Sequence, residues 1–533
     1  MKKIILKNRF VPVVLMVLVI QSCSKKLDLL PTNDVTSETV YATPEGYKQV
    51  LAKVYGSFAL TGNQGPAGNG DVQGIDEGFS DFFRLFWKAQ ELSTDEAVIS
   101  WGDVGIQDFH NMNWTSNNSF LTGLYYRCMY QITLCNEFIR QSADDKLSAR
   151  GITGADADNI RQYAREARFL RAFQYWVLMD LYGKPPFATE STTIGGAPPP
   201  QASRLEVFTY IEDELLAIEP DMTAAKANEY GRADRAAVWA LLARLYLNAE
   251  VYTGTPRYTD AITYAKKVID AGYSLVGDYT WLMRADNNLN TSEFIFSINY
   301  DGLKTQGYGG TTFLSHACVG GSMPAASFGI AGGWSGTRTT KNLPALFPGY
   351  PDFSTVTDHR AQFYTAGQNL EINNLTTFTD GLGVTKYRNT KRDGSPGQSQ
   401  DFSDIDMPLF RLAEMYLIYA EAVLRNGSGG DATVALGYIN ALRERAYGNA
   451  SGDISAGQLD LDFILDERAR ELYWEGFRRT DLIRYKRFVE GSYLWPWKGG
   501  VKSGTSVQSF RDVYPIPSRD INSNTNLVQN TGY

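Results

Sequence analysis

The stretch that decides the fold runs from Arg232 to Gly272 and reads RADRAAVWALLARLYLNAEVYTGTPRYTDAITYAKKVIDAG. Its apolar residues recur every three or four positions in two blocks, which is the spacing of one buried face on an α-helix. Small residues lie among the larger ones, so that two helices can approach closely. Each block ends near a Gly, as helices commonly do. The stretch therefore predicts a helical hairpin.

Four further stretches show the same helical spacing. They begin at Arg165, Met407, Asp431 and Leu461 and read REARFLRAFQYWVLMDLYG, MPLFRLAEMYLIYAEAVLRNG, DATVALGYINALRERAYG and LDFILDERARELYWEGFRRTDLIRYKRF. The stretches from Met407 and Asp431 are consecutive and predict a second hairpin. Hairpins of the tetratricopeptide kind stack so that neighbours bury a shared face. We therefore predict a mainly α-helical scaffold built from such hairpins.

Two long segments interrupt this scaffold, at about 61–118 and about 272–403. Both are rich in Gly, Asn, Ser, Thr and aromatic residues. Loops carried on a rigid scaffold are where binding residues concentrate. We therefore predict a single body over residues 43–533, in which these loop insertions form a ligand-binding face.

The N-terminus has the features of an export signal. Basic residues in 1–9 precede the apolar run FVPVVLMVLVI at 10–20, which is about half of the ~20 residues that span a bilayer. The run ends in Gln21-Ser22-Cys23, where a small residue before a cysteine has the character of a bacterial lipobox. We predict a lipoprotein signal peptide at 1–22, lipidation of Cys23 and a polar tether at 23–42. The alternative is ordinary cleavage near Ser22 with a free Cys23.

The other cysteines do not suggest a disulfide or a metal site. Cys128, Cys135 and Cys318 are odd in number and contain no CxxC pair. Cys128 and Cys135 are seven residues apart, about 10.5 Å along a helix, which exceeds the ~7 Å limit for a disulfide. We predict that they are buried apolar thiols.

Charge excludes nucleic acid as a partner. The 533 residues include 51 basic and 59 acidic ones, for a net charge of −8, and no stretch gathers Lys and Arg into a basic face. Aromatic residues make up 13% of the chain, which suits either a large core or a surface that stacks flat ligands.

Motifs of catalysis are absent from the sequence. HExxH, P-loop, GxSxG and GxGxxG patterns do not occur, and the three histidines, His110, His316 and His359, are scattered. Acidic and basic residues between Asp466 and Arg478 could suggest a glycosidase pair of carboxylates, but their three- and four-residue spacing favours structural ion pairs. We predict no enzyme activity.

No metal or other cofactor is predicted either. Asp401, Asp404 and Asp406 are close in sequence and offer carboxylates to a cation, but they lack the Gly and the terminal Glu of a calcium loop. Calcium therefore has only weak support.

Two tryptophans lie where core residues are not expected. Trp101 and Trp334 are in Gly-containing loops, in DEAVISWGD and GGWSG. An exposed indole can cover the apolar face of a sugar ring while nearby polar groups bind its hydroxyls, so both favour ligand binding over packing. Most other tryptophans lie on helical or apolar stretches and are predicted core residues: Trp87, Trp114, Trp176, Trp239 and Trp474.

Taken in order along the chain, these segments resemble the SusD/RagB-like family of outer-membrane nutrient-binding lipoproteins of Bacteroidetes. The resemblance is carried by the lipobox, REARFLRAFQYWVLMDLYGKPPF, RAAVWALLARLYLN, FRLAEMYLIYAEA, ERARELYWEGFRRTDLIR and the terminal YPIPSRDINSNTNLVQNTGY. It covers essentially the whole mature chain. It implies about four tetratricopeptide units and a partner, the SusC-like TonB-dependent transporter with which the family works.

Within the family, the match is closest to its starch-binding member, through DEGFSDFFRLF, YGGTTF and LWPWKGG. That resemblance implies an aromatic arc for an α-glucan, formed here by Trp101, Tyr308 and Trp334, with Arg84 as a polar contact. The sequence departs from the pattern at two positions, where Ile99 replaces a second tryptophan and Val104 replaces an asparagine.

The residues and the resemblance together predict a cell-surface, lipid-anchored glycan-binding protein. It would capture an α-glucan such as starch or a maltooligosaccharide and deliver it to the transporter. The alternatives are the same fold binding peptides, as the RagB branch suggests, a structural scaffold for the transporter, or a glycoside hydrolase.

Overall fold

The stretch from Arg232 to Gly272 folds into two packed helices, as its spacing predicts. The computed structural model describes residues 37–533, in which α10 (Arg235–Leu247) packs against α12 (Tyr258–Ile269). Asp234 caps α10, because its carboxylate accepts hydrogen bonds from the backbone N–H groups of the first turn. The predicted hairpin is confirmed.

The second hairpin is also confirmed, with one correction. α14 (Leu412–Leu424) packs against α15 (Ala432–Tyr447), and also against α12 and α16 (Leu461–Leu472). However, the first five residues of the predicted helix form strand β8 (Met407–Arg411). They do so because they pair with β4, and the helical spacing of their apolar residues cannot reveal a partner that is distant in sequence.

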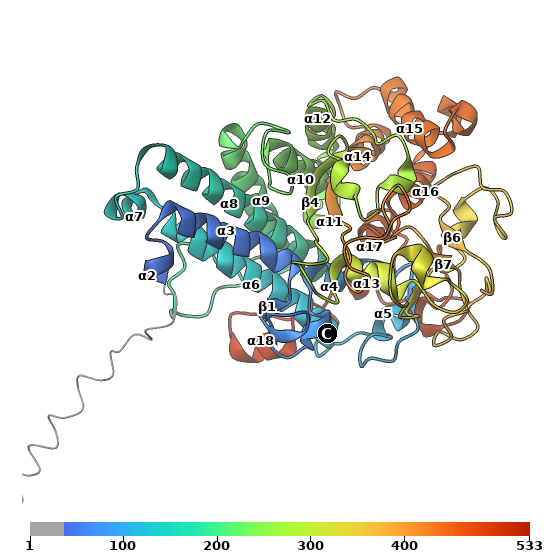
Figure 1. Cartoon of the computed structure of the whole chain (residues 1–533), viewed down its shortest axis with the longest axis horizontal. Helices are drawn as coiled ribbons and strands as arrows, with labels where there is room; N and C mark the ends of the chain where they lie inside the picture. The colour runs from blue at the N-terminus through green and yellow to red at the C-terminus, as the bar shows by residue number, and fades with distance from the viewer. Residues whose placement is uncertain (1–36) are drawn as a thin grey trace, which may run out of the picture.

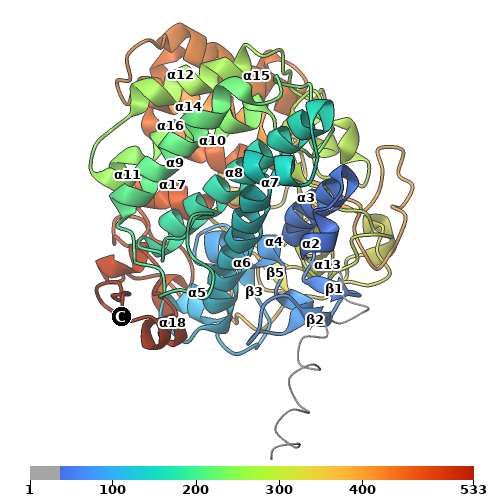
Figure 2. The same ribbon diagram turned by 90° about the vertical axis from the view of Figure 1, so that its left-hand side faces the viewer.

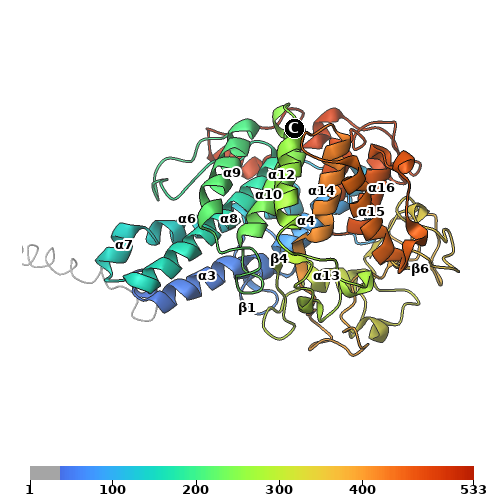
Figure 3. The same cartoon turned by 90° about the horizontal axis from the view of Figure 1, so that it is seen from above.

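Longer helices form the opposite end of the molecule. α3, α6 and α8 lie side by side there, as Figures 1 and 3 show, and α8 extends the helix predicted from Arg165 back to Gly154. α9 packs on α8 and leads towards α10. The bounds of these helices are Pro44–Ala59 for α3, Ser119–Gln141 for α6, Gly154–Tyr182 for α8 and Arg204–Ile218 for α9. The mainly α-helical fold class is confirmed.

The remaining helices are short. Half of them lie in connections between the long helices or in the first insertion. They are α2 (Ser37–Val40), α5 (Asp108–Asn111), α7 (Asp144–Ala149), α11 (Ala249–Thr253), α17 (Arg478–Arg484) and α18 (Ser518–Ser523).

Strands occur only as short antiparallel pairs in the part of the chain that the structure describes. Three of the four pairs have both strands within the predicted insertions, and the fourth joins an insertion to α14. The pairs are β1 (Gly62–Gln64) with β2 (Gly68–Gly70), β3 (Val98–Ile99) with β5 (Thr337–Arg338), β4 (Phe294–Ile298) with β8, and β6 (Phe363–Tyr364) with β7 (Gly383–Val384).

The insertions are not loops throughout, which corrects the sequence prediction. The first contains α4 (Phe82–Glu91), in which every residue is buried, and the second contains the buried helix α13 (Gly310–Ala317). α4 does carry a polar face, with Arg84, Lys88 and Glu91 at helical spacing, but this face is buried too, and the helix is short and lies in a segment whose composition predicts loops. Figure 2 shows β3, β5 and α13 at the end of the molecule opposite α12 and α15.

The stretch from Leu461 forms two helices instead of one, a second correction. α16 ends at Leu472 and α17 begins at Arg478, with Trp474 and Gly476 between them at φ of 63° and 89°. The break is held by a side chain of α4: the Glu91 carboxylate accepts hydrogen bonds from the N–H groups of Gly476 at 2.7 Å and Phe477 at 3.2 Å.

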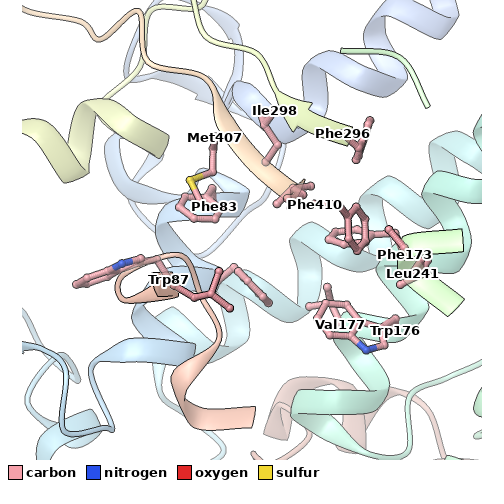
Figure 4. Close-up of a cluster of buried hydrophobic side chains, with 14 of the residues drawn as sticks. Phe83, Trp87, Phe173, Trp176, Val177, Leu241, Phe296, Ile298, Met407 and Phe410 are labelled. Atoms are coloured by element: carbon pink, nitrogen blue, oxygen red, sulfur yellow. The ribbon is translucent and has the colours of Figure 1, made fainter. Parts of the chain in front are cut away.

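Aromatic side chains from both insertions and from the scaffold share one core, part of which Figure 4 shows. Trp87 of α4 meets Trp474 and Phe313, with ring centroids 5.2 and 5.4 Å apart. Four of the five predicted core tryptophans are buried, and Trp239 is half-exposed. The prediction of buried thiols is confirmed for Cys128, Cys135 and Cys318.

The charges between Asp466 and Arg478 form buried ion pairs, as their spacing favoured. Their main partners lie outside α16: Arg360 contacts Glu467 at 2.7 Å, and Arg411 contacts Glu471 at 2.6 Å. Burial alone would raise the pKa of Glu467, but Arg360 and the neighbouring arginines outweigh it and hold this pKa at about 2. These carboxylates tie the second insertion to the helical scaffold.

The predicted signal peptide, Cys23 and the tether up to residue 36 lie outside the described residues. Residues 37–42 of the predicted tether belong to the body instead: Tyr41 is 3% exposed, and its ring packs edge-on against Tyr47 at 4.9 Å. Within 37–533, no helix has the length and apolarity needed to cross a membrane.

Candidate functional site

The β3–β5 ribbon brings the two loop tryptophans together. The N–H of Ser100 donates to the carbonyl of Gly336 at 2.9 Å, just beyond the paired strands. Trp101 comes just after β3 and Trp334 just before β5, at this end of the ribbon. Their ring centroids are 6.4 Å apart, and the ring planes differ by 42°. The indole N–H of Trp101 donates to the backbone carbonyl of Trp334 at 3.1 Å, so Trp101 is fixed in orientation.

Two glycines allow this close packing. A Cβ at Gly336 would lie 2.6 Å from the indole of Trp101, and a Cβ at Gly333 would lie 2.2 Å from the carbonyl oxygen of Val319. Real Cβ contacts are never this short, so only Gly fits at these two positions. Packing therefore requires two of the glycines around Trp334, whereas a Cβ at Gly102 or Gly332 would meet no other atom within 4 Å.

The C-terminus of α13 supports the loop that carries Trp334. The last carbonyl groups of a helix have no partner within the helix. Here the N–H of Trp334 donates to the carbonyl of His316 at 2.9 Å, and the N–H of Gly336 donates to the carbonyl of Ala317 at 2.7 Å. The loop thus caps α13 and takes its position from it.

Tyr308 adds a third ring next to Trp334. Its side chain is 38% exposed, and its ring lies 6.2 Å from the ring of Trp334 and 5.7 Å from that of Phe402. Tyr308 comes just before α13, whose first residue Gly310 donates its N–H to the carboxylate of Asp81 at 2.8 Å. Because Asp81 is also the N-cap of α4, the two buried helices of the insertions are joined at this point.

Arg84 lies behind the three rings and holds Tyr308. It is 6% exposed, and its Nη1 donates to the carbonyl of Tyr308 at 2.6 Å. Its guanidinium is 5.5 Å from the ring of Trp101 and 4.7 Å from that of Phe313, within the range of cation–π contacts. Burial lowers the pKa of Arg84 to about 10, against the opposing charges of nearby aspartates, so the group stays charged at neutral pH.

A second buried cation, Lys88, lies one helical turn further along α4. Its ammonium is 4.0 Å from the ring centroid of Phe120 and 5.2 Å from that of Phe79. Burial, followed by the charge of Arg84, lowers the pKa of Lys88 well below its usual value. Arg84 and Lys88 belong to the wall behind the rings, and no sequence motif pointed to Lys88.

The two departures from the family pattern have different environments. Ile99 is fully buried in β3 and contributes nothing to the surface, whereas Val104 is 92% exposed in the turn after Trp101. The structure therefore brings together all four predicted site residues, Trp101, Tyr308, Trp334 and Arg84. We call the rings of Trp101, Tyr308 and Trp334 the aromatic arc.

The aromatic arc has the chemistry of a stacking surface. Trp101 and Trp334 are half-buried and Tyr308 is exposed, so each ring is fixed yet accessible. Within residues 37–533, no hydrogen bond uses the indole N–H of Trp334 or the hydroxyl of Tyr308, although other polar groups here are bonded. These two donors are free to bind hydroxyl groups at the edge of a stacked ligand.

The aspartates considered as cation ligands accept hydrogen bonds from other groups or face solvent. Asp404 accepts hydrogen bonds from the backbone N–H groups of Gly302 and Gln398, and Asp406 accepts from the hydroxyl of Tyr230 at 2.8 Å. Asp401 is exposed. Within 37–533, no three His, Cys, Asp or Glu side chains are grouped as metal ligands would be.

Phe402 and Phe313 are contacts of the arc that the sequence did not indicate. Phe402 follows Asp401 in a polar segment, and Phe313 lies in α13, a helix within a segment that the sequence predicts to be a loop. The sequence does not indicate that either phenylalanine belongs to the site, because their role depends on contacts between segments far apart in the chain. The YGGTTF stretch, which contains Phe313, contributes only to the resemblance to the starch-binding family member.

Comparisons with known proteins identify related chains. A family model described as the SusD family matches residues 350–533. The starch-binding protein SusD of Bacteroides thetaiotaomicron is 37% identical over an alignment that covers 96% of this chain and 96% of its own length.

Two solved structures share the fold. Surface glycan-binding protein A from Bacteroides fluxus is 21% identical, with a TM-score of 0.69 over 92% of this chain and 100% of its own. Surface glycan-binding protein A from Bacteroides thetaiotaomicron, in complex with laminarihexaose, is 20% identical, with a TM-score of 0.69 over 91% of this chain and 99% of its own.

Proposed function

The chain belongs to the SusD family, and from this premise we propose that it is a surface lipoprotein that binds a glycan on the aromatic arc. It delivers the captured oligosaccharide or polysaccharide to a SusC-like TonB-dependent transporter in the outer membrane. The observation that carries the proposal is the arc itself. Ring centroids 6.2 and 6.4 Å apart present a fixed, accessible stacking surface with two free hydrogen-bond donors.

The arc suits a sugar because a pyranose ring has one apolar C–H face and hydroxyl groups around its edge. Trp101 and Trp334 cover the apolar face, and the indole N–H of Trp334 and the hydroxyl of Tyr308 reach the edge. A shallow, open site of this kind binds weakly, with Kd of about 10 μM to 1 mM. Weak binding serves a protein that must release its cargo to a transporter.

An α-glucan such as starch or a maltooligosaccharide is the proposed cargo. The support is the 37% identity to a starch-binding relative, together with the tilt of 42° between Trp101 and Trp334, which suits a curved chain better than a flat one. Ile99 and Val104 remove one ring and one amide from the family pattern, so we expect fewer ligand contacts than in that relative.

Surface location and the lack of catalysis are part of the same proposal. The signal peptide at 1–22 and Cys23 support a lipid anchor in the outer membrane. Binding without bond cleavage is supported by the buried and ion-paired state of the carboxylates Glu467, Glu471 and Glu475, which leaves them no access to a substrate.

Affinity electrophoresis tests the proposal. The protein lacking residues 1–23 is run through native gels that contain amylopectin, pullulan, dextran, laminarin or levan. We expect retardation by amylopectin and pullulan, and its loss in Trp334→Ala, because this substitution removes the ring of the arc that contacts both of the others. Trp239→Ala is the matched control, since Trp239 is also half-exposed but binds Glu219 through its indole N–H at 2.7 Å, away from the arc.

Other outcomes point to the alternatives. Retardation by laminarin or levan alone would keep glycan binding and reject the α-glucan. Migration unchanged in every gel would reject glycan binding and favour peptide cargo, and a Trp334→Ala variant that is still retarded would reject the arc as the site.

A further inference from the structure

The imidazole of His316 lies directly behind Trp334. The two ring centroids are 4.8 Å apart and their planes differ by 30°, which makes this a closer contact than those of Trp334 with Trp101 and Tyr308, at 6.4 and 6.2 Å. His316 is 2% exposed, so it faces the inner side of the indole. Its backbone carbonyl also accepts the N–H of Trp334. One residue therefore contacts both the backbone and the side chain of Trp334.

The imidazole is held from two sides. Its Nδ1 is 2.9 Å from the carbonyl oxygen of Thr312 in the preceding turn of α13, and its Nε2 is 3.2 Å from the carbonyl oxygen of Gln400. Burial lowers the pKa of His316, so the ring is neutral at neutral pH and donates one hydrogen bond at a time. The carbonyl of Gln400 also accepts the N–H of Ala331, at the start of the loop that carries Trp334.

Trp334 needs such support because its own loop does little to fix its ring. Gly332 and Gly333 precede it, and within 37–533 no hydrogen bond uses its indole N–H. Its backbone is anchored on α13, but the rotation of the side chain depends on what packs against it. Offset stacking of aromatic rings favours a defined angle between them.

We infer that His316 is a positioning residue for the aromatic arc: its ring supports the inner face of Trp334 and sets the tilt at which the outer face meets a sugar. This inference rests on the glycan-binding function proposed above. It assigns a role to α13, which presents His316 to the arc from inside the molecule. It also explains why a histidine buried away from solvent lies at this site without taking part in any chemistry.

Fluorine NMR of the free protein tests the positioning without a ligand. Tryptophans are replaced by 5-fluorotryptophan, and the resonance of Trp334 is assigned by its loss in Trp334→Phe. His316→Gln keeps a donor for the carbonyl of Gln400 but removes the ring, whereas His316→Phe keeps a ring and removes both nitrogen contacts. We expect the Trp334 resonance to move or broaden in His316→Gln and to stay close to the wild-type position in His316→Phe.

Affinity for the retarding glucan is then measured on the same variants. Loss of one aromatic stacking contact predicts about threefold to tenfold weaker binding in His316→Gln, and His316→Phe should restore most of it. His359→Gln is the matched control, because His359 is exposed and should change neither measurement. Thermal melts confirm folding, and His316→Asn makes the same comparison if His316→Gln does not fold.

The outcomes separate this inference from the proposed function. An unmoved Trp334 resonance in His316→Gln, or an equal shift in His316→Phe, would overturn the positioning role. A moved resonance in a protein that no gel retards would leave the positioning role standing and reject glycan binding.

Discussion

Glu91 and Glu96 form a buried carboxyl pair at the break between α16 and α17. Glu91 accepts the N–H groups of Gly476 and Phe477, and Glu96 accepts the N–H of Trp474 at 3.1 Å. Burial raises the pKa of Glu91 to about 7, and burial together with the charge of Glu91 raises the pKa of Glu96 well above its usual value. At neutral pH at least one of the two carboxyl groups is therefore protonated.

This pair predicts a stability that falls as the pH rises. The folded state holds the proton of Glu91 up to about pH 7, while an unfolded Glu loses it near pH 4.3. The stabilisation is fully present below the unfolded pKa and is lost as the pH rises through the folded pKa. We expect Glu91→Gln to reduce this loss between pH 5 and 8 by about 1–3 kcal/mol.

Urea unfolding of the wild type and of Glu91→Gln, each at pH 5 and at pH 8, measures this effect. Gln at position 91 can still accept the two backbone N–H groups, so the α16–α17 break should persist. If the free energy of unfolding depends on pH equally in the variant and the wild type, the carboxyl groups of Glu91 and Glu96 do not share a proton.

At the residue scale, the sequence predicted the burial of apolar side chains better than the burial of charged ones. Trp101 and Trp334 are predicted site residues because both lie in Gly-containing loops, where a core tryptophan is less expected. Arg84 was predicted as a ligand contact and lies buried against the carbonyl of Tyr308, and Lys88 was not noticed. Burial of a charge is decided by neighbours from distant segments, which a single sequence does not reveal.

At the scale of elements, α16 joins the second insertion to the scaffold through its acidic face. Glu471 contacts Arg411 at 2.6 Å and Arg360 at 3.3 Å, and it also pairs with Arg445. All of these groups are nearly inaccessible to water. Removal of one member leaves buried arginines without a counter-charge, which costs more than the pair itself contributes.

Glu471→Gln should therefore reduce the free energy of unfolding by about 3–5 kcal/mol. The measurement is equilibrium unfolding in urea at pH 7. Asp462→Asn is the control from the same helix, because its contact with Arg487 is on the surface, with the Asp462 side chain 73% exposed, and should contribute less than about 1 kcal/mol. Similar losses in the two variants would contradict the structural role of Glu471.

The sequence predicted helices in which apolar residues recur at helical spacing over a long stretch. α10, α12, α14 and α15 were found in this way. It missed the helices α3, α6 and α9, the buried helices α4 and α13, the strand β8 at the start of a helical pattern, and the break at Trp474. The strand and the break depend on partners more than a hundred residues away, which are β4 for β8 and Glu91 for the break.

At the scale of the whole molecule, the proposed lipid anchor should determine where the protein resides. We expect Cys23→Ser to abolish incorporation of labelled palmitate in cells of the native host and to release the protein from the outer-membrane fraction. Fractionation and treatment of intact cells with protease measure the two effects. A Cys23→Ser protein that stays in the membrane fraction and remains protease-accessible would contradict anchoring through Cys23.

The pairing of β4 with β8 has a consequence for how this protein can change over evolution. Because Ile298 lies opposite Met407, the chain between them leaves the scaffold and returns to it at the same place. Tyr308 and Trp334 lie in the segment between these two strands, whereas Trp101 and Arg84 lie in the first insertion. Recombination between related genes at these two neighbouring points exchanges two of the three rings of the aromatic arc and keeps the helical framework. One pair of crossovers can therefore change the ligand preference proposed for the arc.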